Sequence, residues 1–116
     1  MTEKVVIFAF SGEPMCFGHA LLNAKDLMER GHETKLVVEG MATRQLVELD
    51  EGGRPFSSLY SKVKVLGLID CVCQACATKT GSLEGVQAQG LRLCNEMAGH
   101  PSMGRYIEAG YRVLVL

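Results

Sequence analysis

Apolar residues occur along this chain in short dense runs, separated by stretches with helical spacing. The first run, 4–10, reads Lys-Val-Val-Ile-Phe-Ala-Phe, a nearly continuous apolar, β-branched and aromatic segment. Such a run is typical of a strand that is covered on both faces. Further strands are predicted at 35–38, 68–73 and 111–116, with a weaker one at 90–94.

Between these runs, apolar residues recur with the period of a helix. They do so from Ala20 to Met28, and Gly31 then supplies a C-terminal stop. The segment 56–66 fits both periods, but five apolar residues at helical spacing outweigh two that alternate, so we predict a helix there. Other short helices are predicted around Leu46, over 74–80, and from His100-Pro101-Ser102 onward, with the proline at the first helical position.

Strands that alternate with helices predict a parallel sheet, because each crossover must span one face of that sheet. We therefore expect a three-layer α/β domain with a five-stranded, mainly parallel sheet, helices on both faces and flavodoxin-like layering. A chain of 116 residues fits one domain, so residues 1–116 are assigned to a single domain. Reactive groups in such sheets gather beyond the carboxyl ends of the strands.

Three of the five cysteines lie within six residues, in Cys71-Val72-Cys73-Gln74-Ala75-Cys76. This segment is predicted to join a buried strand to a helix, where the partial positive charge of the helix N-terminus favours a thiolate. Cys73 is therefore expected to have a pKa below the usual value of about 8.5 and to be the most reactive thiol. With Cys16 and Cys94 also placed after strands, all five cysteines are expected near one edge of the sheet.

Four segments of the sequence carry a family resemblance. They are Val5-Val6-Ile7-Phe8-Ala9-Phe10, the segment from Cys16 to Ala24, the segment from Gly67 to Ala77, and Gly110-Tyr111-Arg112-Val113. Through them essentially the whole chain resembles the DsrE/DsrF-like family of sulfur-relay proteins. These are small α/β domains, and their better-known members pass sulfane sulfur between proteins as a cysteine persulfide.

The resemblance implies a role for Cys73. In relay members the sulfur-accepting cysteine ends the third strand and is followed by a short alanine-rich helix and a glycine, which Cys73, Ala75, Ala77 and Gly81 match. It implies a sulfur carrier or sulfurtransferase that works as a trimer or hexamer with sulfur donor and acceptor proteins. Cys76 is the second candidate thiol. Cys71, Cys76 and Cys94 are additional to the one cysteine that the relay pattern requires, so a protein that works with a pair of thiols stays an alternative.

Three other readings of the cysteines stay open. One is a non-catalytic oligomeric binding or assembly subunit, in which the cysteines pack as small buried hydrophobes. Another is a metal site, because Cys71, Cys73 and Cys76 with His19 or His100 include the ligands that zinc prefers, although a single Cys-x-x-Cys argues against it. The third is thioredoxin-like disulfide exchange by Cys73 and Cys76, for which the usual aromatic and proline neighbours are missing.

The remaining chemically capable side chains are expected in ordinary structural roles. Cys16 and Cys94 are predicted to pack, Glu13 and Glu39 to be solvated loop carboxylates, His19 and His100 to serve at the surface or as caps, and Lys79 to be solvated. Proton acceptance by Glu13 or Glu39 near Cys73 is the less favoured alternative.

Composition and missing motifs exclude several other classes of function. With 12 basic and 13 acidic residues and a net charge of -1, no basic surface for nucleic acid or anionic lipid stands out. Ser11-Gly12-Glu13 after the first strand places an acid where a flavin phosphate would bind, and no nucleotide-binding motif is present. No cofactor is therefore expected.

The sequence also predicts where the protein works. No apolar run approaches the roughly 20 residues needed to span a bilayer, and the N-terminus has no leader pattern, so we expect no membrane association. The odd number of five cysteines fits free thiols in a reducing compartment better than a disulfide framework. A cytoplasmic location is therefore predicted.

Overall fold

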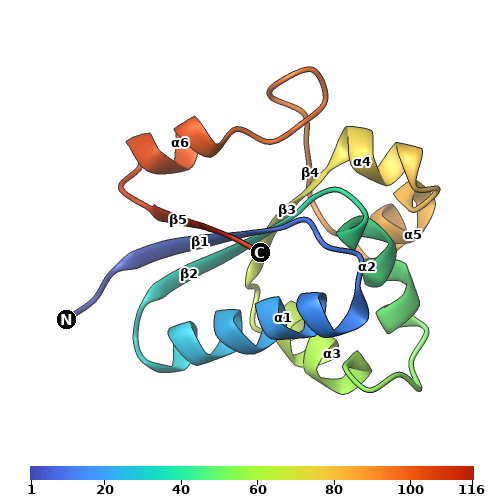
Figure 1. The fold of residues 1–116 in the computed structure, drawn as a ribbon, viewed down its shortest axis with the longest axis horizontal. Coiled ribbons are helices and arrows are strands. Elements are labelled where there is room, and N and C mark those ends of the chain that lie inside the picture. Colours follow the sequence, from blue (N-terminus) through green and yellow to red (C-terminus); the bar gives the residue numbers. More distant parts are fainter.

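The computed structural model describes residues 1–116 as one sheet with helices packed on it (Figure 1). The strands are β1 (Lys4–Ala9), β2 (Glu33–Val38), β3 (Ile69–Cys73), β4 (Leu93–Cys94) and β5 (Arg112–Val115). The helices are α1 (Pro14–Glu29), α2 (Ala42–Asp50), α3 (Ser57–Val65), α4 (Gln74–Lys79), α5 (Leu83–Ala88) and α6 (Met103–Glu108). None of these helices is both long and apolar enough to cross a membrane.

The five strands form one parallel sheet in the order β4-β3-β2-β1-β5. This confirms the predicted α/β fold class. The first three crossovers move across the sheet in the same direction, so their helices are placed on one face. The chain then returns from β4 to the opposite edge, and α6 lies on the other face by itself (Figure 1).

The two faces of the sheet bury cores of unequal size. The larger cluster contains 17 buried residues and draws side chains from α1 to α5, including Phe17, Leu46 and Tyr60. The smaller cluster contains seven buried residues, of which α6 supplies Tyr106, and the partly buried Met103 of α6 packs against it. The third layer is therefore thin, and polar contacts beside α6 help to hold it in place.

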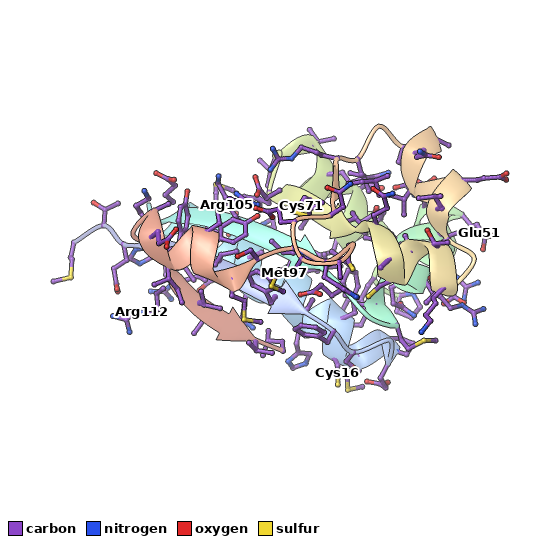
Figure 2. The ribbon with its side chains drawn as sticks, turned by 90° about the horizontal axis from the view of Figure 1, so that it is seen from above. Cys16, Glu51, Cys71, Met97, Arg105 and Arg112 are labelled. Atoms are coloured by element: carbon purple, nitrogen blue, oxygen red, sulfur yellow. A yellow bond between two sulfur atoms is a disulfide. The ribbon has the colours of Figure 1, made fainter.

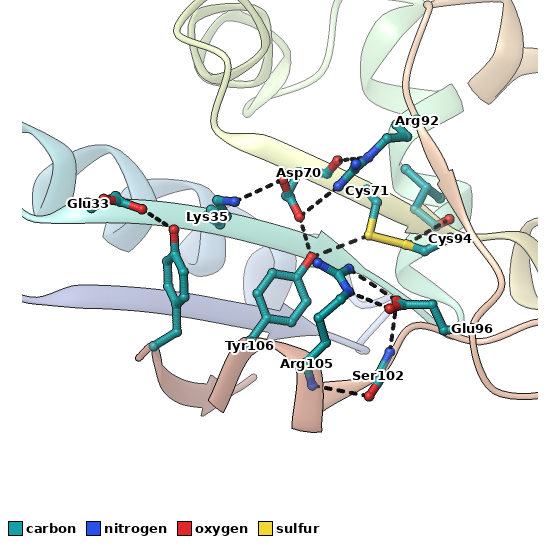
Figure 3. A network of polar contacts seen from close by, with 12 residues as sticks. Glu33, Lys35, Asp70, Cys71, Arg92, Cys94, Glu96, Ser102, Arg105 and Tyr106 are labelled. Atoms are coloured by element: carbon teal, nitrogen blue, oxygen red, sulfur yellow. Dashed lines mark hydrogen bonds and ion pairs between the residues drawn. A yellow bond between two sulfur atoms is a disulfide. The ribbon is translucent and has the colours of Figure 1, made fainter. Parts of the chain in front are cut away.

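A chain of polar contacts links α6 to the sheet (Figure 3). The hydroxyl of Tyr106 donates to the carboxylate of Asp70, which Arg92 also binds, with 3.1 Å between Nη2 and Oδ2. Next to it, Arg105 pairs with Glu96, and that carboxylate accepts the backbone N–H of Ser102 at 3.3 Å. These contacts fix both ends of the loop between β4 and α6.

The predicted elements differ from the structure most clearly at β4, α5 and α6. Strand β4 has only two residues, shorter than the predicted run over 90–94. Helix α6 begins at Met103, after Pro101, because the Ser102 hydroxyl caps it by accepting the N–H of Arg105 at 3.3 Å. Helix α5 was not predicted, since Val86 is its only fully buried residue and leaves almost no periodic signal.

A disulfide joins Cys71 of β3 to Cys94 of β4, two residues that are 23 positions apart. The expectation that all five thiols are free is therefore wrong for this pair. Both cysteines are buried beside Tyr106 in the smaller core cluster. Neighbouring strands of a sheet bring their Cα atoms to 5.8 Å, which is within the range that a disulfide requires.

We expect the double substitution Cys71→Ala and Cys94→Ala to lower the free energy of unfolding by about 3 kcal/mol, because the link closes a loop of more than twenty residues in the unfolded chain. Denaturant unfolding of the wild type and the variant measures this difference. Cys16→Ala is the matched control, since Cys16 is exposed and free. An unchanged unfolding midpoint in the double variant would contradict the stabilising role of the link.

Candidate functional site

The carboxyl ends of β2 and β3 bring two of the candidate side chains together. Cys73 ends β3 and is also the N-cap of α4, where its sulfur accepts the N–H of Cys76 at 3.4 Å. Glu39 directly follows β2, and its own N–H donates to the carbonyl of Ala9 at 2.8 Å. Because β2 and β3 are adjacent parallel strands, Glu39 and Cys73 come to the same edge of the sheet.

A tight turn in the loop between β4 and α6 supplies the histidine. Met97 and His100 exchange two backbone hydrogen bonds of 2.7 and 2.8 Å around Ala98 and Gly99, both of which have positive φ. The carbonyl of Gly99 accepts the N–H of Ala75 at 3.0 Å, which docks the turn on the start of α4. A Cβ at Gly99 would lie 3.0 Å from the Cβ of Ala75, so glycine suits both the backbone conformation and the space.

Together these elements form one compact group of four side chains, which we call the thiol cluster: Glu39, Cys73, Cys76 and His100. Their sulfur, nitrogen and carboxylate oxygen atoms all lie within 4.8 Å of one another. Nδ1 of His100 is 3.1 Å from the sulfur of Cys73 and 3.8 Å from that of Cys76. The prediction that Cys73 lies at a strand-to-helix junction with Cys76 nearby is confirmed.

The electrostatics of the cluster differ from the expectation. Burial, with a smaller contribution from the hydrogen bond that its side chain makes with Cys76, raises the pKa of Cys73 to about 12. The N–H of Cys76 acts in the opposite direction, as predicted for a helix start, but its effect is the smaller one. Burial likewise raises the pKa of Glu39 to about 7. The predicted lowering of the Cys73 pKa is therefore wrong for this geometry.

The other candidates lie outside the cluster. Cys71 and Cys94 are bonded to each other, so the expected gathering of all five cysteines at one edge is only partly observed. Cys16 is exposed in the first turn of α1, at a margin of the molecule and well apart from Cys71 in Figure 2, and does not pack as predicted. Glu13 caps α1 by accepting the N–H of Cys16 at 2.9 Å, while His19 and Lys79 are exposed.

Glu39 and His100 were expected in ordinary structural roles, and only the less favoured alternatives placed them near Cys73. Glu39 is only 6% exposed, so it is not a solvated loop carboxylate. Its position directly after a buried strand was the available signal, since strand ends meet at one edge. His100 follows Ala98-Gly99, and nothing in the local pattern indicates that this turn folds back onto α4.

Comparison with known proteins gives one relative across most of the chain. An uncharacterized protein of Methanocaldococcus jannaschii is 36% identical over 98 residues, which cover 84% of this chain and 78% of that protein. The chain belongs to the same family as this archaeal protein. Two uncharacterized proteins of Archaeoglobus fulgidus match shorter stretches, at 44% identity over 52 residues and 46% over 35 residues. They cover 45% and 30% of this chain, and 85% and 95% of their own lengths.

Two further comparisons identify no match. No protein-family model matches the chain, and no solved structure matches it. The names of the archaeal relatives state no activity. The thiol cluster is therefore the feature of this chain that bears on function.

We expect the thiols to react with iodoacetamide at neutral pH in the order Cys16, Cys76, Cys73, because reaction requires an accessible thiolate. Cys16 is exposed, Cys76 is partly buried, and Cys73 is fully buried with a raised pKa. Peptide mass mapping after timed quenching gives the order without any substitution. Cys71 and Cys94 should stay unlabelled until the disulfide is reduced. First labelling at Cys73 would show that burial does not control its reactivity.

Proposed function

We propose that this protein is a sulfur carrier or sulfurtransferase that holds sulfane sulfur as a persulfide on Cys73. One observation carries the proposal: Nδ1 of His100 lies 3.1 Å from the sulfur of Cys73. A nucleophile within hydrogen-bond reach of a base is the arrangement that activates cysteine in covalent catalysis. The sequence resemblance to sulfur-relay proteins at residues 67–77 supports the same role.

In the proposed step, His100 takes the proton of the Cys73 thiol and the thiolate attacks the outer sulfur of a donor persulfide. The donor sulfur–sulfur bond breaks, a new one forms on Cys73, and the departing donor thiolate takes up the proton. The products are a Cys73 persulfide and a donor thiol, so no external oxidant or reductant is needed. Attack by an acceptor thiolate on the outer sulfur then returns Cys73 to the thiol.

The N-terminus of α4 supports the charged states of this cycle. The N–H of Cys76 points at the sulfur of Cys73, and a backbone donor at this position stabilises a thiolate more than a thiol. Because burial opposes the charge, His100 has to supply most of the activation. Cys76 is the second thiol of the proposal, since it lies beside both Cys73 and His100.

The proposed function requires that a sulfur donor can reach the sulfur of Cys73. Cys73 is 0% exposed, so a donor reaches it only when the Met97–His100 turn moves away from α4. The same burial favours a second candidate function, a binding or assembly subunit whose cysteines only pack. The two functions differ in whether Cys73 can be loaded with sulfur.

A cytoplasmic location forms part of the proposal, because Cys73 and Cys76 must stay reduced to accept sulfur. The Cys71–Cys94 disulfide is compatible with that environment because both residues are buried, and reduction by exchange requires access to a sulfur atom.

Incubation with a persulfide donor should add the mass of one sulfur atom to each wild-type chain. We expect Cys73→Ser to abolish this gain, Cys76→Ser to reduce it, and His100→Gln to slow loading by about 100-fold, the usual contribution of a positioned base. Intact mass spectrometry over time provides the rates.

Cys16→Ser is the matched control and should load like the wild type, because Cys16 lies outside the thiol cluster. Loading of Cys73→Ser at the wild-type rate would show that the wrong thiol has been assigned. If wild-type protein accepts no sulfur at all, the binding-subunit function replaces the carrier.

We further propose that the protein forms a homo-oligomer of three chains or a multiple of three, as the resemblance to relay proteins implies. Support comes from the edge strand β5, where Leu114, Val115 and the adjoining Leu116 are all more than 40% exposed. We expect light scattering at micromolar concentration to give at least a trimer, and Leu114→Lys to weaken it. A wild-type monomer would contradict this prediction.

A further inference from the structure

We propose that the thiol cluster binds Zn²⁺ or a chemically similar divalent metal ion. Its four ligands would be Glu39, Cys73, Cys76 and His100. This inference does not rest on the proposed sulfur-carrier function. It follows from where three separate segments of the chain place their donor atoms. The end of β2 supplies an oxygen, the junction of β3 and α4 supplies two sulfurs, and the β4–α6 loop supplies a nitrogen.

The spacing of the donor atoms suits a tetrahedral ion. Zinc binds sulfur at about 2.3 Å and nitrogen or oxygen at about 2.0–2.2 Å, so its ligand atoms lie about 3.3–3.8 Å from one another. Nδ1 of His100 is 3.1 and 3.8 Å from the two sulfurs, and all four donors lie within 4.8 Å. Small adjustments of side chains would therefore complete the coordination sphere.

The donor set also selects the kind of ion. Two thiolates and an imidazole suit zinc and its softer neighbours, whereas magnesium and calcium require oxygen ligands. Cys73 and Cys76 have the Cys-x-x-Cys spacing that is common in zinc sites. The set differs from the one considered from sequence, since Cys71 is committed to the disulfide and Glu39 occupies the fourth position.

Glu39 is buried without a lysine or arginine partner. It is only 6% exposed. None of the ion pairs of the molecule includes its carboxylate. Buried acidic groups of this kind are usually paired or coordinate a metal.

Parts of the surrounding backbone are arranged to hold the ligands. The N–H of Cys76 contacts the sulfur of Cys73, as in sites where backbone donors steady a metal-bound thiolate. The turn that carries His100 is fixed by its own two hydrogen bonds and by the Ala75-to-Gly99 bond. The imidazole is therefore held against the two sulfurs by backbone contacts that do not need the ion.

Titration of chelator-treated wild-type protein with Co²⁺ tests the proposal, because thiolate-bound Co²⁺ gives charge-transfer and tetrahedral ligand-field absorption. We expect saturation at one ion per chain and displacement of Co²⁺ by Zn²⁺. Loss of an outer contact to a metal site typically costs 10–100-fold in affinity, so Cys73→Ser, Cys76→Ser and His100→Gln should each cost at least about 100-fold. Glu39→Gln should cost about tenfold or more, and circular dichroism checks that each variant is folded.

Cys16→Ser is the control and should bind Co²⁺ like the wild type. Saturating Zn²⁺ should also protect Cys73 and Cys76, but not Cys16, from iodoacetamide. A wild-type titration without thiolate absorption, or full affinity in folded Cys76→Ser and His100→Gln, would overturn the metal site. Glu39→Gln separates the two functions, since Glu39 has no part in the sulfur-transfer step. If the wild type binds Co²⁺ but accepts no sulfur, the metal site stands and the carrier function fails. If it accepts sulfur but gives no thiolate absorption with Co²⁺, the carrier function stands and the metal site fails.

Discussion

The hydrogen bond from the N–H of Ala75 to the carbonyl of Gly99, 3.0 Å long, connects the two halves of the candidate site. It joins α4, which Cys73 caps and which carries Cys76, to the turn that carries His100. Without this contact the imidazole belongs to a surface loop, and the two thiols face an open strand end. The bond satisfies one of the unpaired N–H groups at the start of a helix, which are donors that need a partner when they are buried. The hydrogen bond that satisfies this N–H of α4 therefore also brings His100 next to the two thiols.

The rest of the fold holds that turn from its other side. Strand β4 is only two residues long, so pairing alone anchors it weakly, and the Cys71–Cys94 disulfide fixes its end to β3. Beyond β4, the Arg105–Glu96 pair and the contact from Tyr106 to Asp70 hold α6 against a face that it covers alone (Figure 3). The less populated face of the sheet therefore depends on covalent and polar links, whereas the face under α1 to α5 depends on apolar packing.

The sequence was sufficient for the parallel sheet because that arrangement is encoded locally. Runs such as 4–10 and 68–73 are apolar enough to be recognised alone, and helical spacing between them implies the crossovers. Cys73 was placed correctly for the same reason, since a strand end and a helix start meet there. The other half of the cluster appeared only among the less favoured alternatives, because its assembly depends on long-range contacts. No local pattern indicates the turn that returns His100 to α4. Glu39 directly follows a buried strand, but its own burial depends on contacts distant in sequence. The raised pKa of Cys73 follows mainly from the burial of Cys73 itself.

The proposed sulfur transfer and the proposed metal binding would make opposite demands on the sulfur of Cys73. As a nucleophile, Cys73 must lose its proton to His100 and then present a free lone pair to the donor persulfide. As a ligand, it directs the same lone pair to the ion, and His100 Nδ1 is no longer available as a base. Burial favours the uncharged thiol of Cys73, whereas both proposed functions need the thiolate. In one function His100 removes the proton, and in the other the bound ion stabilises the thiolate. Since the two uses require the same pair of atoms 3.1 Å apart, one chain can perform only one of them at a time. A bound ion would therefore exclude sulfur from Cys73 until it is released.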